Sequence, residues 1–240
     1  MAKKMVVVIV LAAFGAVGAF ALPEFKLSGG VGPYITSDFG GGVDATAWMS
    51  TSGILWEAKL GHLKTPLYFG QGIGTFFDAT YAEFSLGFFL GMGRWEDYFV
   101  GEGTSRTVML DIGMDIGLML KYPFYVKEHL AIFPLIGINY NLRASTPVDG
   151  DSDEIDFEDL SALWFKFGGG LDVYLKERFY LRTEVLYGFR LKNKYEKDAI
   201  NDMNSLLSGL GGLPAGTGIK ADALRGHGLN IKFAVGFRFY

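Results

Sequence analysis

The chain has 240 residues, no cysteine and a formal net charge of −4. The lack of cysteine excludes disulfides, thiolate metal sites, cysteine nucleophiles and a lipid-modified cysteine at an export cleavage site. The acidic balance argues against nucleic acid as a partner. With 34 glycines and 15% aromatic residues, the chain is long enough for one large β domain or two small ones.

The N-terminal segment has the features of an export signal. Lys3 and Lys4 precede an apolar run over residues 5–17, and Ala19-Phe20-Ala21 fits the small-x-small rule before a cleavage site. We expect a cleaved signal peptide at 1–21 and a mature barrel domain at 22–240. Loss of the two lysines would change the formal net charge from −4 to −6. A membrane anchor that stays in place is the alternative.

From there on, apolar residues alternate with polar ones, which is the period of a strand. Seven segments show the pattern clearly: 25–35, 82–92, 108–122, 130–142, 163–175, 179–191 and 229–239. An eighth strand is needed between residues 36 and 80, and 67–77 is the best candidate. These strands of about 11–15 residues exceed the 9–11 that a tilted membrane span requires.

The predicted connections alternate between short and long. The short ones are 78–80, 122–129 and 176–178; the long ones are 37–66, 96–106, 144–160 and 194–228. Tight turns at one end and long loops at the other are typical of outer-membrane barrels. No linker or change of composition indicates a second domain.

Segment 108–122 shows how the two faces of a strand differ. Asp111 and Asp115 lie on the face opposite Leu110, Ile112 and Ile116. The apolar faces together carry more large residues than an eight-stranded interior holds, which argues against a soluble barrel with an apolar inside. Charge on a lipid-facing wall costs roughly 2–4 kcal/mol per Arg or Lys at the midplane. We therefore expect the charged, glycine-rich face to point inward.

The sequence thus predicts an all-β, eight-stranded antiparallel up-and-down transmembrane β-barrel. Buried charges persist only when they are paired and hydrogen-bonded, so the lumen should hold a charge network. Its predicted members are Glu83, Asp111, Asp115, Lys121, Arg143, Lys166, Asp172, Arg182, Glu184, Arg190, Lys192, Lys232 and Arg238.

Motifs for catalysis, cofactors or metals are weak. The acidic segment 145–160 begins like a calcium loop, but Glu154 replaces the required glycine and Leu160 replaces the closing glutamate, so it reads as a solvated outer loop. The histidines lack ligand spacing. The glycines at 168–170 lack the Lys-Ser/Thr of a phosphate loop and are expected to relieve crowding in the barrel wall. We expect no enzyme activity, cofactor or metal site.

Two further patterns concern the outer parts of the chain. Apolar residues at helical spacing predict a short amphipathic helix at 196–212, and a similar helix is considered for 54–63. Aromatic residues gather near the predicted strand ends, as in the girdles of membrane barrels.

Four stretches carry a resemblance to known proteins: TFFDATYAEFSLGFFLG at 75–91, ALWFKFGGGLDVYL at 162–175, YLRTEVLYGFRLKNKYEKD at 180–198 and HGLNIKFAVGFRFY at 227–240. They resemble spirochaetal (treponemal) outer-membrane β-barrel proteins, and the chain as a whole is similar in style to the OmpX, OmpA-domain and OmpW families. The resemblance implies a place in the bacterial outer membrane, in contact with its lipid. It also implies a C-terminal aromatic signal for the barrel-insertion machinery, from among Phe237, Phe239 and Tyr240.

Two functions remain open from the sequence. In the first, the charge network closes or nearly closes the barrel, and the protein has a structural or surface-interaction role through an extracellular ligand of loops 37–66 and 194–228. In the second, the barrel is a narrow passive channel for small solutes, as in an OmpW-type pore. Eight strands leave little free bore, which favours the first.

Overall fold

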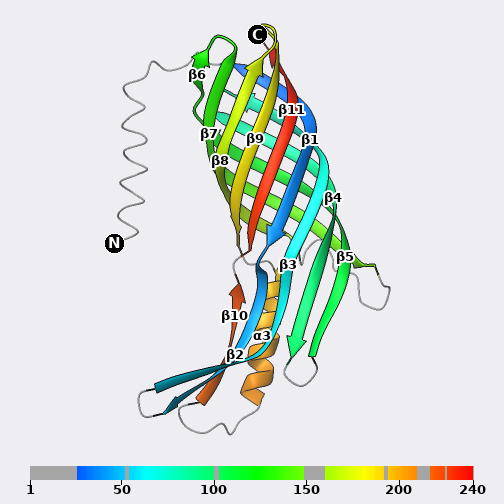
Figure 1. The fold of residues 1–240 in the computed structure, drawn as a ribbon, viewed down its shortest axis with the longest axis vertical. Helices are drawn as coiled ribbons and strands as arrows, with labels where there is room; N and C mark the ends of the chain where they lie inside the picture. The colour runs from blue at the N-terminus through cyan, green and yellow to red at the C-terminus, as the bar shows by residue number, and fades with distance from the viewer. Residues whose placement is uncertain are drawn as a thin grey trace.

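The computed structural model describes residues 26–51, 54–99, 103–148, 160–191, 194–209, 217–224 and 226–239 (Figure 1). The expected signal peptide at 1–21 lies outside these residues. The elements are β1 (Leu27–Phe39), β2 (Gly41–Thr51), β3 (Ile54–Ala79), β4 (Ala82–Phe99), β5 (Gly103–Lys121), β6 (Phe124–Lys127), β7 (Leu130–Pro147), β8 (Ala162–Tyr174), β9 (Phe179–Arg190), α3 (Lys194–Gly209), β10 (Thr217–Leu224) and β11 (His227–Phe239).

Eight of the strands close into an antiparallel barrel. Around the ring they follow the order β1, β3, β4, β5, β7, β8, β9 and β11. The ring closes because β1 pairs with β3 on one side, with Leu27 opposite Ala79, and with β11 on the other, with Leu27 opposite Phe239. The predicted fold class and the eight predicted strand positions are confirmed.

The two faces of the wall point as the alternation predicts. On β5, Asp111 and Asp115 are only 2% and 6% exposed, whereas Ile112 and Leu118 between and beyond them are 55% and 52% exposed. The same alternation of buried and exposed positions runs along β8 and β9. Charged side chains therefore fill the inside of the barrel, and apolar side chains cover its outside.

One end of the barrel carries the short connections, and we call it the short-turn end. The β3–β4 turn there takes only residues 80 and 81, and the β8–β9 turn takes 175–178. The predicted connection 122–129 contains a short strand, β6, which pairs with the start of β7. The first residues of β1 and the last residues of β11 lie at this end too, next to each other.

The opposite end is more structured than the sequence predicts. Residues 37–66 are not a loop: β2 continues β1 beyond a break at Gly40, whose φ is +78°, and both strands pair with the 26-residue β3. The sheet beyond the barrel has the order β10, β2, β3, β4, β5. Register shifts at Ala45/Thr46 and Lys64/Leu67 interrupt the alternation of these strands, which hides them in the sequence.

Two related predictions are also wrong. Residues 54–63 form part of β3 and not a helix: they pair with β2 along one edge, and from Gly61 onward they also pair with β4. The predicted loop 96–106 is largely strand as well, since β4 runs to Phe99 and β5 starts at Gly103. We call the resulting outer part of the molecule the annex: β2, β10, α3 and the parts of β3, β4 and β5 within 54–66, 93–99 and 103–108.

The helix predicted at 196–212 is confirmed as α3, which spans Lys194–Gly209. It contacts β2 and β10 beneath the barrel in the view of Figure 1. Val43, Ala45 and Ala221 are buried in those two strands, so small apolar side chains form the inner layer of the annex. Within the described part of the chain, no helix is both long and apolar enough to cross a membrane.

Candidate functional site

The interior near the short-turn end holds a buried group of ion pairs. We call it the Arg182 cluster, and its members are Asp78, Glu83, Lys121, Asp172, Arg182, Glu184 and Lys232. The Arg182 guanidinium donates two hydrogen bonds of 2.7 Å to Asp172 and one of 2.8 Å each to Asp78 and Glu83. This fork geometry suits arginine and no other side chain.

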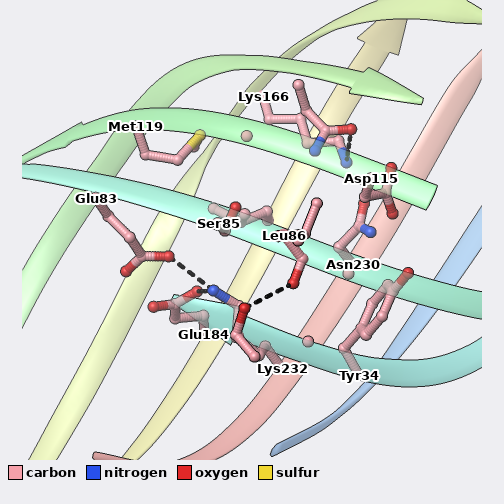
Figure 2. A pocket seen from close by; sticks show the side chains of 16 residues that line it. Tyr34, Glu83, Ser85, Leu86, Asp115, Met119, Lys166, Glu184, Asn230 and Lys232 are labelled. Carbon is pink, nitrogen blue, oxygen red and sulfur yellow. Dashed lines mark hydrogen bonds and ion pairs between the residues drawn. The ribbon is translucent and has the colours of Figure 1, made fainter. Parts of the chain in front are cut away.

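Lys232 extends the cluster toward the middle of the barrel. Its ammonium group lies 2.7 Å from Glu83 and 2.8 Å from Glu184, between the two carboxylates (Figure 2). Lys121 in turn donates to Asp78. Because these residues come from β3, β4, β5, β8, β9 and β11, the cluster connects opposite sides of the ring through the lumen.

Aromatic rings fill the space around the Arg182 guanidinium. Its central carbon lies 4.3 Å from the centre of the Phe76 ring, 4.9 Å from that of Phe133 and 5.3 Å from that of Tyr180. The Tyr180 hydroxyl donates to Ser28 at 2.9 Å. Cation–π contacts of a desolvated guanidinium stabilise by roughly 2 kcal/mol, and Arg182 is only 1% exposed.

A second buried group lies toward the annex. We call it the Asp38 cluster, and its members are Asp38, Asp111, Arg143, Ser145, Arg190 and Glu196. Asp38 lies 3.7 Å from Arg143 and 3.6 Å from Arg190. Arg143 is also 3.5 Å from Asp111, which accepts a hydrogen bond from Ser145.

Helix α3 joins this second cluster from the annex side. Glu196 in its first turn is only 4% exposed and accepts a 2.5 Å hydrogen bond from Arg190 at the end of β9. A carboxylate in the first turn also suits the positive end of the helix dipole. The start of α3 is therefore fixed at the annex end of the lumen by an ion pair.

A cavity of about 50 Å³ lies between the two clusters. Tyr34, Asp115, Lys166, Glu184 and Lys232 are among the residues that line it (Figure 2). Nearby, Lys166 donates to Asn139 at 3.0 Å and Asn141 donates to Asp115 at 2.9 Å. A water molecule needs about 10–15 Å³ of such volume, so the space has room for only a few waters.

Glycines on the inner wall make room for the large rings of the lumen. A Cβ atom at Gly236 would lie 2.1 Å from the Tyr180 ring, and one at Gly170 would lie 2.3 Å from the Phe133 ring. Gly170 belongs to the run 168–170, for which relief of crowding is expected from the sequence. The interior is thus packed by matching small residues on one strand with large ones on the next.

Most of the predicted network residues lie inside the barrel, nine of them in the two ion-pair clusters and two, Asp115 and Lys166, bonded to asparagines. They are Glu83, Asp111, Asp115, Lys121, Arg143, Lys166, Asp172, Arg182, Glu184, Arg190 and Lys232. Arg238 lies at the short-turn end, half-buried, with its guanidinium 3.6 Å from the centre of the Tyr174 ring. Lys192 lies outside the described residues, as do Tyr240 and the calcium-like part of the acidic segment, 149–159.

Three carboxylates of the network are absent from the sequence-based set. Asp38 and Asp78 continue the inward even-numbered positions of β1 and β3, so extension of the alternation along these strands would have found them. Glu196 lies in a helix and carries no such signal. Across the described residues, no group of three or more His, Cys, Asp or Glu side chains is arranged to hold a metal ion.

The outer wall carries a belt of exposed apolar side chains. It reaches from Phe84 to Met92 on β4 and from Leu120 to Leu110 on β5, and similar runs cover the other strands. Eleven residues at about 3.3 Å per residue and a tilt of about 40° span roughly 28 Å. That height matches the apolar band of a membrane barrel. A continuous exposed apolar surface around the wall is also far larger in area than the apolar patches of soluble proteins.

Aromatic side chains mark both ends of this belt. At the short-turn end, Phe237 packs against Phe179 and Phe239, with ring centres 5.2 and 5.6 Å apart. At the annex end, Phe189 packs against Tyr187 and His227 at 5.3 and 5.2 Å. The C-terminal aromatics Phe237 and Phe239 thus belong to an aromatic group on the outer wall.

The annex carries a surface ion-pair group outside the belt. Glu96 lies 3.2 Å from the His62 Nε2 atom and accepts a 3.0 Å hydrogen bond from Arg106. The hydrogen bond from His62, followed by that from Arg106, holds the pKa of Glu96 below its usual value. His62 also stacks on Tyr98, with ring centres 5.6 Å apart.

No known protein family and no curated protein match the chain. Its fold is similar to that of OprG from Pseudomonas aeruginosa, with 10% identity, a TM-score of 0.46 and coverage of 92% of this chain and 98% of that one. Neisserial surface protein A has 12% identity and a TM-score of 0.37, with coverage of 86% of this chain and 97% of that one. Ail of Yersinia pestis has 12% identity and a TM-score of 0.35, with coverage of 87% of this chain and 99% of that one. At such values the likeness says nothing of function. By its own strand pairing, the chain is a closed eight-stranded β-barrel.

Proposed function

We propose that this protein is an integral barrel of a bacterial outer membrane whose lumen is closed or very narrow, and that its role is structural or one of surface interaction. The apolar belt supplies the lipid contact and the aromatic groups lie at the two interfaces. The annex stands outside the membrane, where a ligand or partner can reach it. The proposal includes assembly by the barrel-insertion machinery and no enzymatic activity.

The filled interior is the observation that carries the proposal. The Arg182 cluster and the Asp38 cluster lie one above the other in the lumen, and Arg182, Glu83 and Glu184 are each about 1% exposed. The cavity between them holds about 50 Å³. A continuous water path would require these ion pairs to separate, which costs several kcal/mol per uncompensated buried charge.

The same cavity favours the alternative function, a narrow channel for small solutes. Glu83, Glu184 and Lys232 border it on one side and Asp115 and Lys166 on the other. The annex favours the surface role, because it replaces the expected loops 37–66 and 194–228 by an ordered sheet with a helix. A spirochaetal or OmpX/OmpW-like origin stays a prediction.

Single-channel conductance of the refolded mature chain in a planar bilayer tests the closed lumen. Heat-modifiable gel migration establishes that the chain is folded, and a general porin inserted in the same way shows that the bilayer reports pores. We expect silence from the inserted protein. Discrete, reproducible current steps would instead support the channel and overturn the closed barrel.

A further inference from the structure

At the annex end of the belt, outward-facing charges lie together on one side of the barrel. On β4 the apolar run ends at Met92, and the next outward side chain is the exposed Arg94. On β5 the run ends at Leu110 and Val108, followed by Arg106, whose side chain is 60% exposed. Lys64 takes the corresponding place on β3.

The strand register gathers these three cations into one group. Glu96 lies directly opposite both Lys64 and Arg106, while Arg94, two residues nearer the belt, lies opposite Leu67 and Val108. Diagonal neighbours on a sheet are about 7–8 Å apart, so the Arg94 guanidinium can approach the charged groups of Lys64 and Arg106. We call Lys64, Arg94 and Arg106 the rim cation patch.

The charge of the patch is only partly balanced. Arg106 pairs with Glu96 at 3.0 Å, and Lys64 lies 3.5 Å from Asp44. Among the residues that the structure describes, no carboxylate pairs with Arg94. Arg94 is the register partner of Leu67 on one side and Val108 on the other, so its exposed side chain starts from an apolar wall at the edge of the belt. This is the position of a snorkelling arginine.

The described residues of β7 and β9 show no such charge at the same level. The outward positions at this end of β7 and β9 are occupied by Leu142, Ala144, Thr146, Phe189 and Leu191. The excess positive charge is therefore local and lies at the height where lipid headgroups meet the protein. A guanidinium fork with a second cation beside it matches the oxygens of a phosphate group.

We propose that the rim cation patch binds the phosphate of an anionic lipid headgroup in the outer leaflet. The inference rests on the membrane placement proposed above and adds a specific lipid contact to it. Arg94 supplies the unpaired guanidinium, and Arg106 and Lys64 supply the surrounding positive charge.

Native mass spectrometry of the folded mature chain in detergent micelles tests this contact, with phosphatidylglycerol and phosphatidylcholine as probes. We expect phosphatidylglycerol to bind about tenfold more tightly. A variant with Lys64→Gln, Arg94→Gln and Arg106→Gln should lose about tenfold in phosphatidylglycerol affinity. The control variant Lys176→Gln, Lys197→Gln, Lys220→Gln removes the same charge from exposed positions outside the patch and should lose less than twofold.

Three results would overturn the inference. They are equal losses in the two triple variants, no preference for phosphatidylglycerol, and displacement of the lipid by millimolar inorganic phosphate, which would indicate a soluble-anion site. If the triple variant does not fold, Arg94→Gln alone should weaken binding by about threefold. A folded barrel that fails to insert into vesicles contradicts the membrane placement itself, whereas an inserted barrel without lipid preference contradicts only the rim contact.

Discussion

Arg182 is the residue on which the lumen depends most. Its guanidinium donates hydrogen bonds to Asp172, Asp78 and Glu83, and the side chain is only 1% exposed. With four carboxylates and three cations in the Arg182 cluster, loss of this side chain would leave several carboxylates close together without compensation. Removal of one partner from a buried network is far more costly than loss of a surface pair.

We predict that Arg182→Ala lowers the free energy of unfolding by about 3–5 kcal/mol, measured by denaturant titration of the barrel in micelles. Arg182→Lys should recover only part of the loss, because an ammonium group cannot make the forked contact with Asp172. Lys176→Ala, at an exposed position of the β8–β9 turn, serves as the control. Equal stability of Arg182→Ala and the control would show that the network contributes nothing to folding.

Glu96 gives the annex a defined response to acid. Its pKa is lowered in the folded state, so its contribution is fully present above the unfolded value of about 4.3 and is lost as the pH falls through the lower folded value. We predict constant protection of residues 93–108 from hydrogen exchange at neutral and mildly acidic pH, and a decrease only below about pH 4. Glu96→Gln should abolish this pH step, and a step that persists in the variant would assign it to another group.

At the scale of elements, the barrel and the annex share strands but have different cores. β1 pairs directly with β11 on one side and with β3 on the other, so the ring does not need β2 or β10 to close. The annex relies instead on α3 and on small buried side chains such as Val43 and Ala221. The barrel should therefore tolerate removal of the annex.

We predict that replacement of residues 42–64 and 194–224 by short Gly/Ser turns leaves a barrel that still folds. Heat-modifiable migration and a sheet-type circular dichroism spectrum are the measurements. Because Arg190 keeps Asp38 as a partner when Glu196 is lost, the stability should fall by about 1–3 kcal/mol at most. Failure to fold would show that the annex is an obligate part of the barrel.

The elements also show how much of the fold can be predicted from the sequence. Lipid outside and charge inside impose a period of two, so the eight barrel strands and the inward place of Asp111 are readable from residue order alone. Bulges near Ala45 and Lys64 shift the alternation, so the sequence predicts a loop at 37–66 and a helix at 54–63 where the structure has strands. The partners of Arg182 are set by the stagger of six strands around a ring, and no local pattern encodes that stagger.

At the scale of the whole molecule, the two ends of the barrel differ. The short-turn end carries Lys127 and Lys176 in tight connections, whereas the other end carries the annex with Lys59 and Lys220. In barrels of the outer membrane the short turns face the periplasm and the longer segments face outward. The annex, and with it the rim cation patch, should then lie on the cell surface.

We predict that a membrane-impermeant amine reagent labels Lys59 and Lys220 on intact cells, while Lys127 and Lys176 react only after permeabilisation. Mass spectrometry of the modified peptides reads out all four positions in one experiment. The reverse pattern would place the annex in the periplasm, and labelling of both sets on intact cells would indicate a protein outside the membrane.

The pairing of β1 with β11 also fixes the order in which the molecule can be built. Every other pairing in the ring joins barrel strands that follow each other along the chain, whereas this one joins the first to the last of them. Until β11 arrives, the free edges of β1 and β9 stay open, and Glu83 and Glu184 lack Lys232. Open edges are prone to pair with other chains. The polypeptide therefore has to be kept from aggregating until its last strand is delivered, and closure of the ring is the step at which wall and lumen become complete together.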